Sequence, residues 1–268
     1  NLLHQNNIAC FRTPESCAES VKTFLNTKNP VKPIILKNDL SDISKKLEKN
    51  IFKNLSEDEA LEIFKDIGIE IVDYKVSSNE KQAIEYSSQI GFPLAMKVLS
   101  SEIMHKTETG GVELNIKNLE EVKISFKKLS DVFQKLKINS SEKKFIIQKM
   151  EKGIAEIILG YRVDELVGPI VVIGSGGILS EIYNDKSIRM APVDITEAKK
   201  MIKEVKSLVT ITGYRGLPEV DINIIATAIV NISKFALVKE IKEAEINPVI
   251  VKKNNEGIVA VDGLITLK

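Results

Sequence analysis

The sequence has little of what marks several classes of protein. It contains no tryptophan and, among 268 residues, two cysteines, Cys10 and Cys17. These cysteines have no partners at metal-ligand spacing, so we expect neither structural zinc nor a disulfide framework, and a reducing cytoplasm is the expected compartment. No apolar run approaches the length of a membrane span, and no signal-peptide pattern opens the chain.

An excess of charge of either sign is also missing. The 38 basic and 37 acidic side chains give a formal net charge of +1. This balance leaves no electrostatic footprint for nucleic acid or for an anionic membrane, so neither is an expected partner. The chain has 43% hydrophobic and 28% charged residues, which is the composition of a globular protein with an ample core.

Residues 1–54 differ in composition from the rest of the chain. Residues 8–11 are expected to form a short strand, and Thr13 is predicted to cap a helix that has Pro14 at its first position. Residues 25–54 are rich in Lys, Asn and Ser and are predicted to form a weakly structured linker. Because the chain starts without methionine, we expect it to be a fragment of a longer protein.

A main domain of mixed α+β class is predicted from residue 55 to the end. The capping box at Ser56 and Glu59 precedes an apolar run of helical period, which Gly68 ends. Helical and strand patterns then follow along the chain. The further expected helices are 79–90, 118–136, 196–208 and 221–238. The expected strands are 69–76, 93–98, 112–116, 145–150, 156–159, 170–173, 178–183, 246–251 and 257–262.

The last two strands are predicted to form a hairpin around a turn at residues 254–255. In that register Asn247 lies directly opposite Asp262, with Cβ atoms about 5 Å apart. An amide oxygen and a carboxylate at this distance could hold Mg²⁺ together with the phosphates of a substrate. The same pattern also fits an ordinary polar pair at the end of a hairpin.

The stretch from Lys97 to Val112 combines several groups that suit phosphate chemistry. Lys97 interrupts an apolar strand, where an unpaired charge is costly, although its stem could pack while its ammonium reaches water. His105 could accept a phosphoryl group, or it could be an exposed loop residue. Gly110 and Gly111 could bring the backbone close to a phosphate, or they could form a simple turn.

The order of these motifs is more specific than any one of them. The series closely resembles the ATP-grasp domain of ADP-forming acyl-CoA synthetases, the acetate–CoA ligase type related to succinyl-CoA synthetase. The resemblance runs from about Leu55 to Lys268, and residues 1 to about 30 resemble the tail of a preceding CoA-ligase domain. Its motifs are Gly91-Phe92-Pro93, Lys97, His105-Lys106, Gly110-Gly111-Val112, Gly168-Pro169, Gly176-Gly177, Gly213-Tyr214-Arg215-Gly216 and Glu245-Ile246-Asn247-Pro248.

The resemblance implies an ATP-grasp fold with lobes of about 55–147 and 148–268 and ATP or ADP between them. It implies the exchange of acyl-CoA, ADP and phosphate with free acid, CoA and ATP through phosphohistidines. The first phosphohistidine and the CoA site would lie on CoA-binding domains, fused or in a separate subunit, which are the expected partners. An oligomer is also expected.

The same resemblance implies roles for individual residues. His105 falls on the second phosphohistidine. Glu245 stands where the family usually has an aspartate, and a carboxylate at this position could orient His105 or stabilise its charge. Asn247 and Asp262 fall on the Mg²⁺ ligands. The nucleotide-side set comprises the phosphate-contacting Lys97, the phosphate-covering Gly110 and Gly111, the adenine hinge Gln148, Lys149 and Met150, and Glu156.

Two rival functions remain open from the sequence. Similar synthetase-like regions are fused to protein acetyltransferases, in which the ATP-grasp part is a non-catalytic regulatory module. A different ATP-grasp ligase could instead release a free acyl phosphate, and such an enzyme would not need a histidine in this loop. The carboxylic acid is not predicted, because its pocket is expected outside this chain.

Overall fold

The protein forms two compact units, residues 1–35 and 36–268, and each is described by itself. The structure is a computed structural model. It describes residues 5–6, 8–26, 40–48, 54–100, 109–135, 143–177, 185–213, 215, 220–253 and 256–268. None of the helices in this part of the chain has the length and apolar composition of a membrane span.

The first unit contains helix α2 (Pro14–Asn26). The backbone N–H of Ser16 donates to Thr13 Oγ1 at 3.2 Å, and the N–H of Thr13 donates to Ser16 Oγ at 3.3 Å. Thr13 therefore caps the helix and Pro14 is its first residue, as predicted. The strand expected at residues 8–11 is wrong, because these residues have no strand conformation and their apolar side chains are exposed.

The predicted linker at residues 25–54 is also partly wrong. It contains the last residues of α2 and a further helix, α3 (Ser41–Glu48), in the second unit. Ile43 and Leu47, four residues apart, lie on one face of α3 and are buried in the core of that unit. The helix was not predicted because two apolar positions within a stretch rich in Lys and Asn give only a weak periodic signal. Its stability comes from packing against the rest of the unit.

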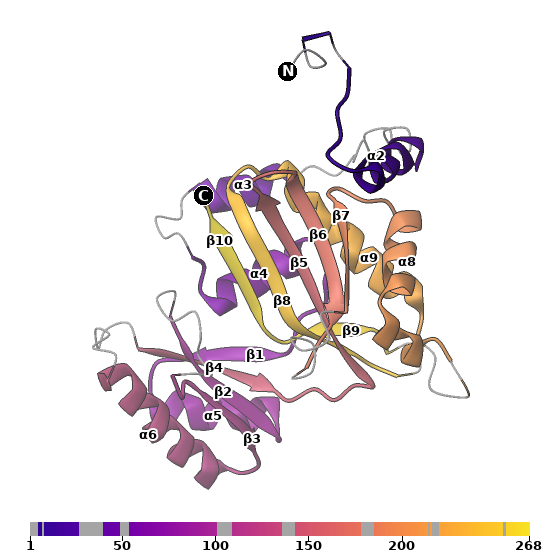
Figure 1. The fold of residues 1–268 in the computed structure, drawn as a ribbon. Helices are drawn as coiled ribbons and strands as arrows, with labels where there is room; N and C mark the ends of the chain where they lie inside the picture. Colours follow the sequence, from indigo (N-terminus) through magenta and orange to yellow (C-terminus); the bar gives the residue numbers. More distant parts are fainter. Residues whose placement is uncertain are drawn as a thin grey trace. The chain divides into compact units, whose positions relative to one another are not determined.

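A four-stranded antiparallel sheet has the order β1-β4-β2-β3. Met96, Val98, Phe145 and Ile147 project from one face into a core that also contains residues of two helices. Figure 1 shows these helices, α5 and α6, beside the sheet. The bounds are β1 (Tyr74–Ser77), α5 (Glu80–Ile90), β2 (Leu94–Leu99), β3 (Val112–Ile116), α6 (Leu119–Lys135) and β4 (Lys144–Lys149).

The other face of this sheet belongs to a different core. Side chains alternate along a strand, so Lys97 and Leu99 of β2 lie on the face opposite Met96 and Val98. Leu99 and Ile146 belong to the large cluster that also contains residues of the second sheet. Lys97 is therefore on the face of the small sheet that meets the rest of the unit.

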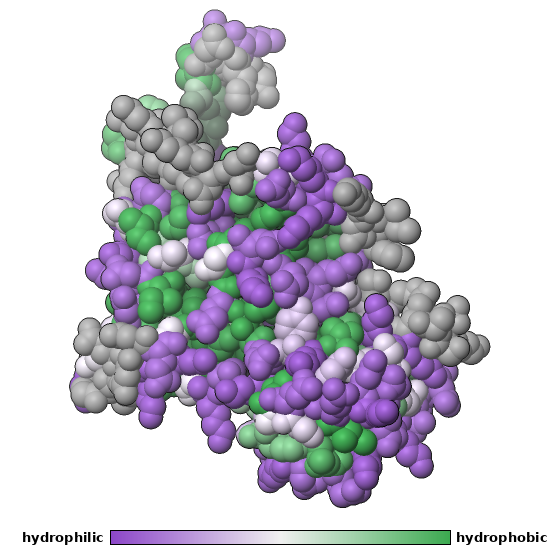
Figure 2. Space-filling model, turned by 180° about the vertical axis from the view of Figure 1, so that it is seen from behind, coloured by the Kyte–Doolittle hydropathy of each residue, from purple (hydrophilic) through white to green (hydrophobic). Residues whose placement is uncertain are grey.

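The larger sheet has the order β10-β8-β5-β6-β7, and β9 also pairs with β8. Helices α4, α8 and α9 contact its strands, and Figure 1 shows α4 and α9 behind them. Figure 2 shows the opposite side of the molecule, where hydrophobic residues gather in patches between hydrophilic ones. The bounds are α4 (Glu57–Asp66), β5 (Ala155–Asp164), β6 (Gly168–Ser175), β7 (Lys186–Met190), α8 (Ile195–Glu204), η2 (Lys206–Ile211), α9 (Ile222–Ser233), η4 (Lys234–Leu237), β8 (Ile241–Val251), β9 (Ile258–Ala260) and β10 (Gly263–Leu267).

The predicted hairpin register is confirmed. Val249 pairs with Ala260 and Val251 pairs with Ile258. The N–H of Asn247 donates to the carbonyl oxygen of Asp262 at 3.2 Å, so these two residues lie opposite each other as expected. The turn residues 254–255 lie outside the described residues.

Several other boundaries differ from the prediction. The strand expected at 69–76 begins at Tyr74, and the helices expected at 196–208 and 221–238 each end in a 3₁₀ segment. The short strands β7 and β10 were not predicted. The strand expected at 178–183 lies outside the described residues.

Candidate functional site

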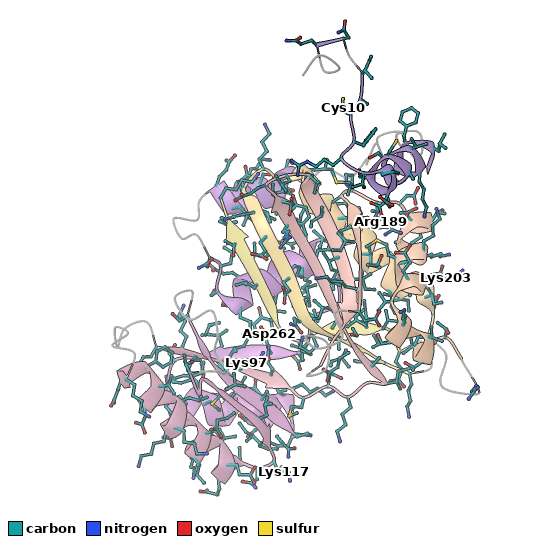
Figure 3. All side chains as sticks on the ribbon, in the orientation of Figure 1. Cys10, Lys97, Lys117, Arg189, Lys203 and Asp262 are labelled. Carbon is teal, nitrogen blue, oxygen red and sulfur yellow. The ribbon has the colours of Figure 1, made fainter. Side chains whose placement is uncertain are left out.

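Lys97 is buried at the junction of the two sheets. Its side chain is 8% exposed, within a strand whose six residues are all buried. The ammonium Nζ donates to Glu57 Oε1 at 2.7 Å and to Asp262 Oδ2 at 3.1 Å. It also lies 3.2 Å from the carbonyl oxygen of Val261. Figure 3 shows Lys97 and Asp262 next to each other, and the ammonium is held by protein groups rather than reaching water.

The two carboxylates keep Lys97 charged. Burial lowers the pKa of the ammonium, but the charges of Glu57 and Asp262 and their hydrogen bonds outweigh that effect. The net result is a pKa of Lys97 above its ordinary value. Lys97 therefore stays protonated at neutral pH, with its positive charge between two carboxylates.

Glu57 is a site residue to which the sequence motifs assign no role, because it lies between the capping-box residues Ser56 and Glu59. Its side chain is fully buried, and Gln148 Nε2 donates to the same Oε1 that accepts from Lys97, at 3.1 Å. Helical spacing in the sequence could have indicated that Glu57 is buried, because Glu57, Leu61 and Phe64 share one face of α4. A carboxylate in line with buried apolar residues needs a partner inside the protein.

Gly263 lets α4 approach the strand that follows Asp262. A Cβ atom on Gly263 would lie 2.6 Å from Cε2 of Phe64, which is too close for any side chain without movement. The capping box at the start of α4 is confirmed, since the N–H of Ser56 donates to Glu59 Oε2 at 2.9 Å. The helix is thus fixed at its first turn and against β10, which holds Glu57 near Lys97.

The proposed metal ligands lie beside this ion pair. Asn247 and Asp262 are opposite each other, and Asn247 Nδ2 donates to Glu245 Oε1 at 3.2 Å. No group of three or more His, Cys, Asp or Glu side chains gathers as a metal site in the described part of the chain. One carboxylate and one amide oxygen nevertheless fit Mg²⁺, which is commonly held by few protein ligands and by substrate phosphates. The assignment of these ligands stays a prediction.

The glycine pair returns the chain to the sheet beside Lys97. Gly110 has φ +72°, and the carbonyl oxygen of Gly111 accepts from the N–H of Val98 at 2.9 Å. Lys97 itself pairs with Val112. Residues 101–108, which include His105 and Lys106, lie outside the described residues.

The predicted adenine hinge continues from Gln148 at the end of β4. The N–H of Lys149 donates to the carbonyl of Asp73, and that of Met150 donates to the carbonyl of Pro93, both at 3.0 Å. These two donors are thus already used within the protein. The side chain of Gln148 is buried and donates to Glu57, a contact that the predicted hinge did not include.

The backbone of Glu156 packs closely against Gly176. The N–H of Gly176 donates to the carbonyl of Glu156 at 2.7 Å. A Cβ on Gly176 would lie 2.8 Å from the carbonyl carbon of Glu156, so a residue with a side chain would not fit there. The side chain of Glu156 is exposed on β5.

Comparison with known proteins agrees with this architecture. A family model described as an ATP-grasp domain matches residues 45–267. The chain is 38% identical over 214 residues to the β subunit of acetate–CoA ligase [ADP-forming] I of Pyrococcus furiosus, covering 80% of this chain and 91% of that subunit. It is 30% identical over 275 residues to 4-hydroxybutyrate–CoA ligase [ADP-forming] of Nitrosopumilus maritimus, covering 99% of this chain and 39% of that protein.

A solved structure is similar over most of the chain. It is the dinucleotide-forming acetyl-coenzyme A synthetase 1 of Ca. Korarchaeum cryptofilum, with 32% identity and a TM-score of 0.77 over 86% of this chain and 100% of that chain. This chain therefore belongs to the ATP-grasp domains of the ADP-forming acyl-CoA synthetases, which confirms the resemblance and the fold class expected from the sequence. It spans nearly all of a β subunit and about two-fifths of the longer ligases.

Proposed function

We propose that this chain binds ATP or ADP with Mg²⁺ at the Lys97 site and that His105 accepts the γ-phosphoryl group. The observation that carries the proposal is the buried, charged Lys97, held between Glu57 and Asp262. Its strand leads directly into residues 101–108, the segment that contains His105. A positive charge held near the transferring phosphoryl group favours such a transfer, because catalysis there is mainly positioning and charge stabilisation.

Each predicted residue then has a role. Lys97 binds phosphate oxygens and offsets their charge, while the backbone at Gly110 and Gly111 covers them. Asp262 and Asn247 hold Mg²⁺, which neutralises phosphate charge when bound. The hinge Gln148, Lys149 and Met150 lies beside the base, with Glu156 on the nucleotide side. Glu245, which accepts a hydrogen bond from Asn247, orients His105 or stabilises its charge.

The chemical step is an in-line displacement. A neutral imidazole nitrogen of His105 forms a bond to the γ-phosphorus, the bond from that phosphorus to the bridging oxygen breaks, and ADP leaves. In support, a related structure, 32% identical with a TM-score of 0.70, holds Mg-AMPPCP and has a phosphohistidine segment pointing towards the nucleotide-binding site.

The complete reaction needs partners. In this proposal the overall reaction converts acyl-CoA, ADP and phosphate to free acid, CoA and ATP. The CoA site and the first phosphohistidine lie on CoA-binding domains, in a second subunit or in the same chain, within an oligomer. Relatives occur both as separate β subunits and as longer ligases, which supports either arrangement. Residues 1–54 would then comprise the tail of such a domain and a linker whose helix α3 packs on the ATP-grasp domain, residues 55–268.

Labelling with γ-³²P-ATP and Mg²⁺ tests the proposal. The wild-type chain should acquire acid-labile label, and His105→Ala should abolish it. The chain has two histidines, so His4→Ala is the matched control and should leave the labelling intact. Label that persists in His105→Ala, or that resists mild acid, contradicts the assignment.

The same chain also allows the regulatory alternative to be tested. A catalytic module should exchange phosphoryl groups between ATP and labelled ADP in a magnesium-dependent reaction. A non-catalytic module would show no exchange, even if it binds nucleotide.

A further inference from the structure

Glu57 is a fully buried carboxylate to which neither the sequence motifs nor the proposed reaction assigns a role. Its Oε1 accepts from Lys97 at 2.7 Å and from Gln148 at 3.1 Å. The three side chains come from α4, β2 and β4, so one carboxylate oxygen joins the first helix of the domain to the small sheet.

The second carboxylate near Lys97 has a different environment. The side chain of Asp262 is 40% exposed, whereas that of Glu57 is 0% exposed. The contact from Lys97 is also longer to Asp262, at 3.1 Å, than to Glu57. Asp262 can therefore reach a solvent-borne cation, and Glu57 cannot.

The proposed function gives Asp262 to the metal ion. A carboxylate that binds Mg²⁺ has its charge largely neutralised, so it no longer compensates a neighbouring ammonium. A buried ammonium without a counter-charge is strongly unfavourable. Lys97 would then keep its charge and its direction through Glu57.

We propose that Glu57 is the positioning residue of the phosphate site: it holds Lys97 in place while Asp262 passes from the lysine to the metal ion. This inference rests on the proposed function of Lys97 and Asp262. Glu57 touches neither nucleotide nor metal, and it acts through the lysine. Gln148 fixes the same oxygen, so the hinge beside the base and the phosphate-binding lysine share one support.

A double-mutant cycle tests the proposal. Calorimetric binding of Mg-ADP and of adenosine is measured for the wild type, Glu57→Gln, Lys97→Met and the double variant. Glu57→Gln should weaken Mg-ADP binding about tenfold or more and leave adenosine binding unchanged, because the loss concerns the phosphates. In the Lys97→Met background, Glu57→Gln should cause no further loss of Mg-ADP affinity, because there is no lysine to position.

The control lies in the same helical turn. Glu59→Gln makes the same chemical change at an exposed position and should leave both affinities as in the wild type, because glutamine also closes a capping box. If Glu57→Gln does not fold, Glu57→Asp carries the test, since it keeps the charge but moves it back by about 1.5 Å. It should weaken Mg-ADP binding selectively, by less than the neutral variant.

The outcomes separate the inference from the proposed function. A wild type that binds no Mg-ADP overturns the proposed function and the inference with it. Intact wild-type binding with unchanged affinity in Glu57→Gln overturns the inference and leaves the proposed function standing. Equal losses for adenosine and Mg-ADP, or a loss that persists in the Lys97→Met background, show a general structural role and also overturn the inference.

Discussion

At the scale of single residues, the site depends on how a positive charge is kept inside the protein. Lys97 has two carboxylates within 3.1 Å, one fully buried and one partly exposed. Removing the sole partner of a buried charge costs about 3–5 kcal/mol, and the loss of Glu57 should cost less than that because Asp262 remains beside Lys97. The exposed partner contributes less to stability and remains accessible to ligands. The two acidic residues are thus suited to different tasks.

Asp262→Asn should therefore affect metal use more than folding. The free energy of unfolding should change little, because Glu57 still compensates Lys97. The gain in ADP affinity on adding Mg²⁺ should fall about tenfold or more, since an amide is a much weaker ligand than a carboxylate. Calorimetry with and without EDTA measures it. Asp131→Asn, on the exposed side of α6, is the control. A retained magnesium effect in Asp262→Asn contradicts the ligand assignment.

At the scale of secondary structure elements, the position of α4 decides whether Glu57 reaches the site. Phe64 packs where Gly263 has no side chain, and the same helix carries Glu57 seven residues earlier. Glycine at this position is required by packing and not by backbone conformation. A substitution of Gly263 on β10 should therefore shift Glu57 at the other end of α4.

Gly263→Ala should destabilise the domain by about 1–3 kcal/mol, the usual cost of overpacking a well-filled core. It should also weaken Mg-ADP binding, because α4 must move away from β10. Chemical denaturation and calorimetry measure the two effects. Gly160→Ala is the matched control in the same sheet, because a Cβ there meets its nearest atom at an ordinary 3.8 Å. Equal behaviour of the two variants would contradict this account of α4.

Arg189 ties strand β7 to helix α8, and Figure 3 shows it on that side of the large sheet. Its guanidinium donates to Glu197 at 2.7 Å and to Glu204, one near each end of the helix. The pKa of both carboxyl groups is lowered, and the hydrogen bonds from Arg189 are the largest cause. A carboxyl group whose pKa is lowered by folding stabilises the folded state at pH values above its ordinary pKa. That stability is lost as the pH falls through the lowered pKa.

Arg189→Gln should thus be less stable than the wild type at pH 7, by about 1 kcal/mol or less because the pairs are partly exposed. The difference should shrink as the pH falls below about 4.5. Urea denaturation of the two proteins between pH 3 and 7, roughly the range that spans carboxyl titration, measures it. Lys200→Gln, which loses an exposed contact to Glu197, should show a smaller effect. A difference that grows at low pH contradicts the prediction.

Local signals in the sequence predicted much of the fold. The capping residues Thr13 and Ser56, the terminating Gly68 and the hairpin register each depend on neighbours within a few positions. The contact between Glu57 and Lys97 could not be read in this way, because it joins two elements across 40 residues. The helix α3 and the strands β7 and β10 were missed for a similar reason, since packing against distant elements decides them.

At the scale of the whole molecule, the chain consists of a short first unit and a large second one. Residues 36–268 form one compact unit that contains both sheets and every described residue of the candidate site. The ATP-grasp family match also falls inside it, at residues 45–267. The second unit should accordingly be sufficient for folding and for nucleotide binding.

Deletion of residues 1–35 should leave the melting temperature and the Mg-ADP affinity of the chain unchanged. Mg-ADP at 100 times its dissociation constant should stabilise both forms by about 2.7 kcal/mol. Differential scanning calorimetry with and without ligand checks both statements. A truncated chain that melts lower, or that gains less from the ligand, would show that the first unit supports the second.

The long strand β8 has a consequence for how this protein can vary. It pairs with β9 on one side of Val261 and Asp262 and with β10 on the other, so Asp262 is held in register from both directions. Residues could be inserted at the hairpin tip around 254–255 without shifting the aspartate, because β10 fixes it independently. Changes in the length and composition of the tip should therefore be tolerated. Strand β10, in contrast, cannot shift its register by one residue without turning its side chains to the opposite face of the sheet.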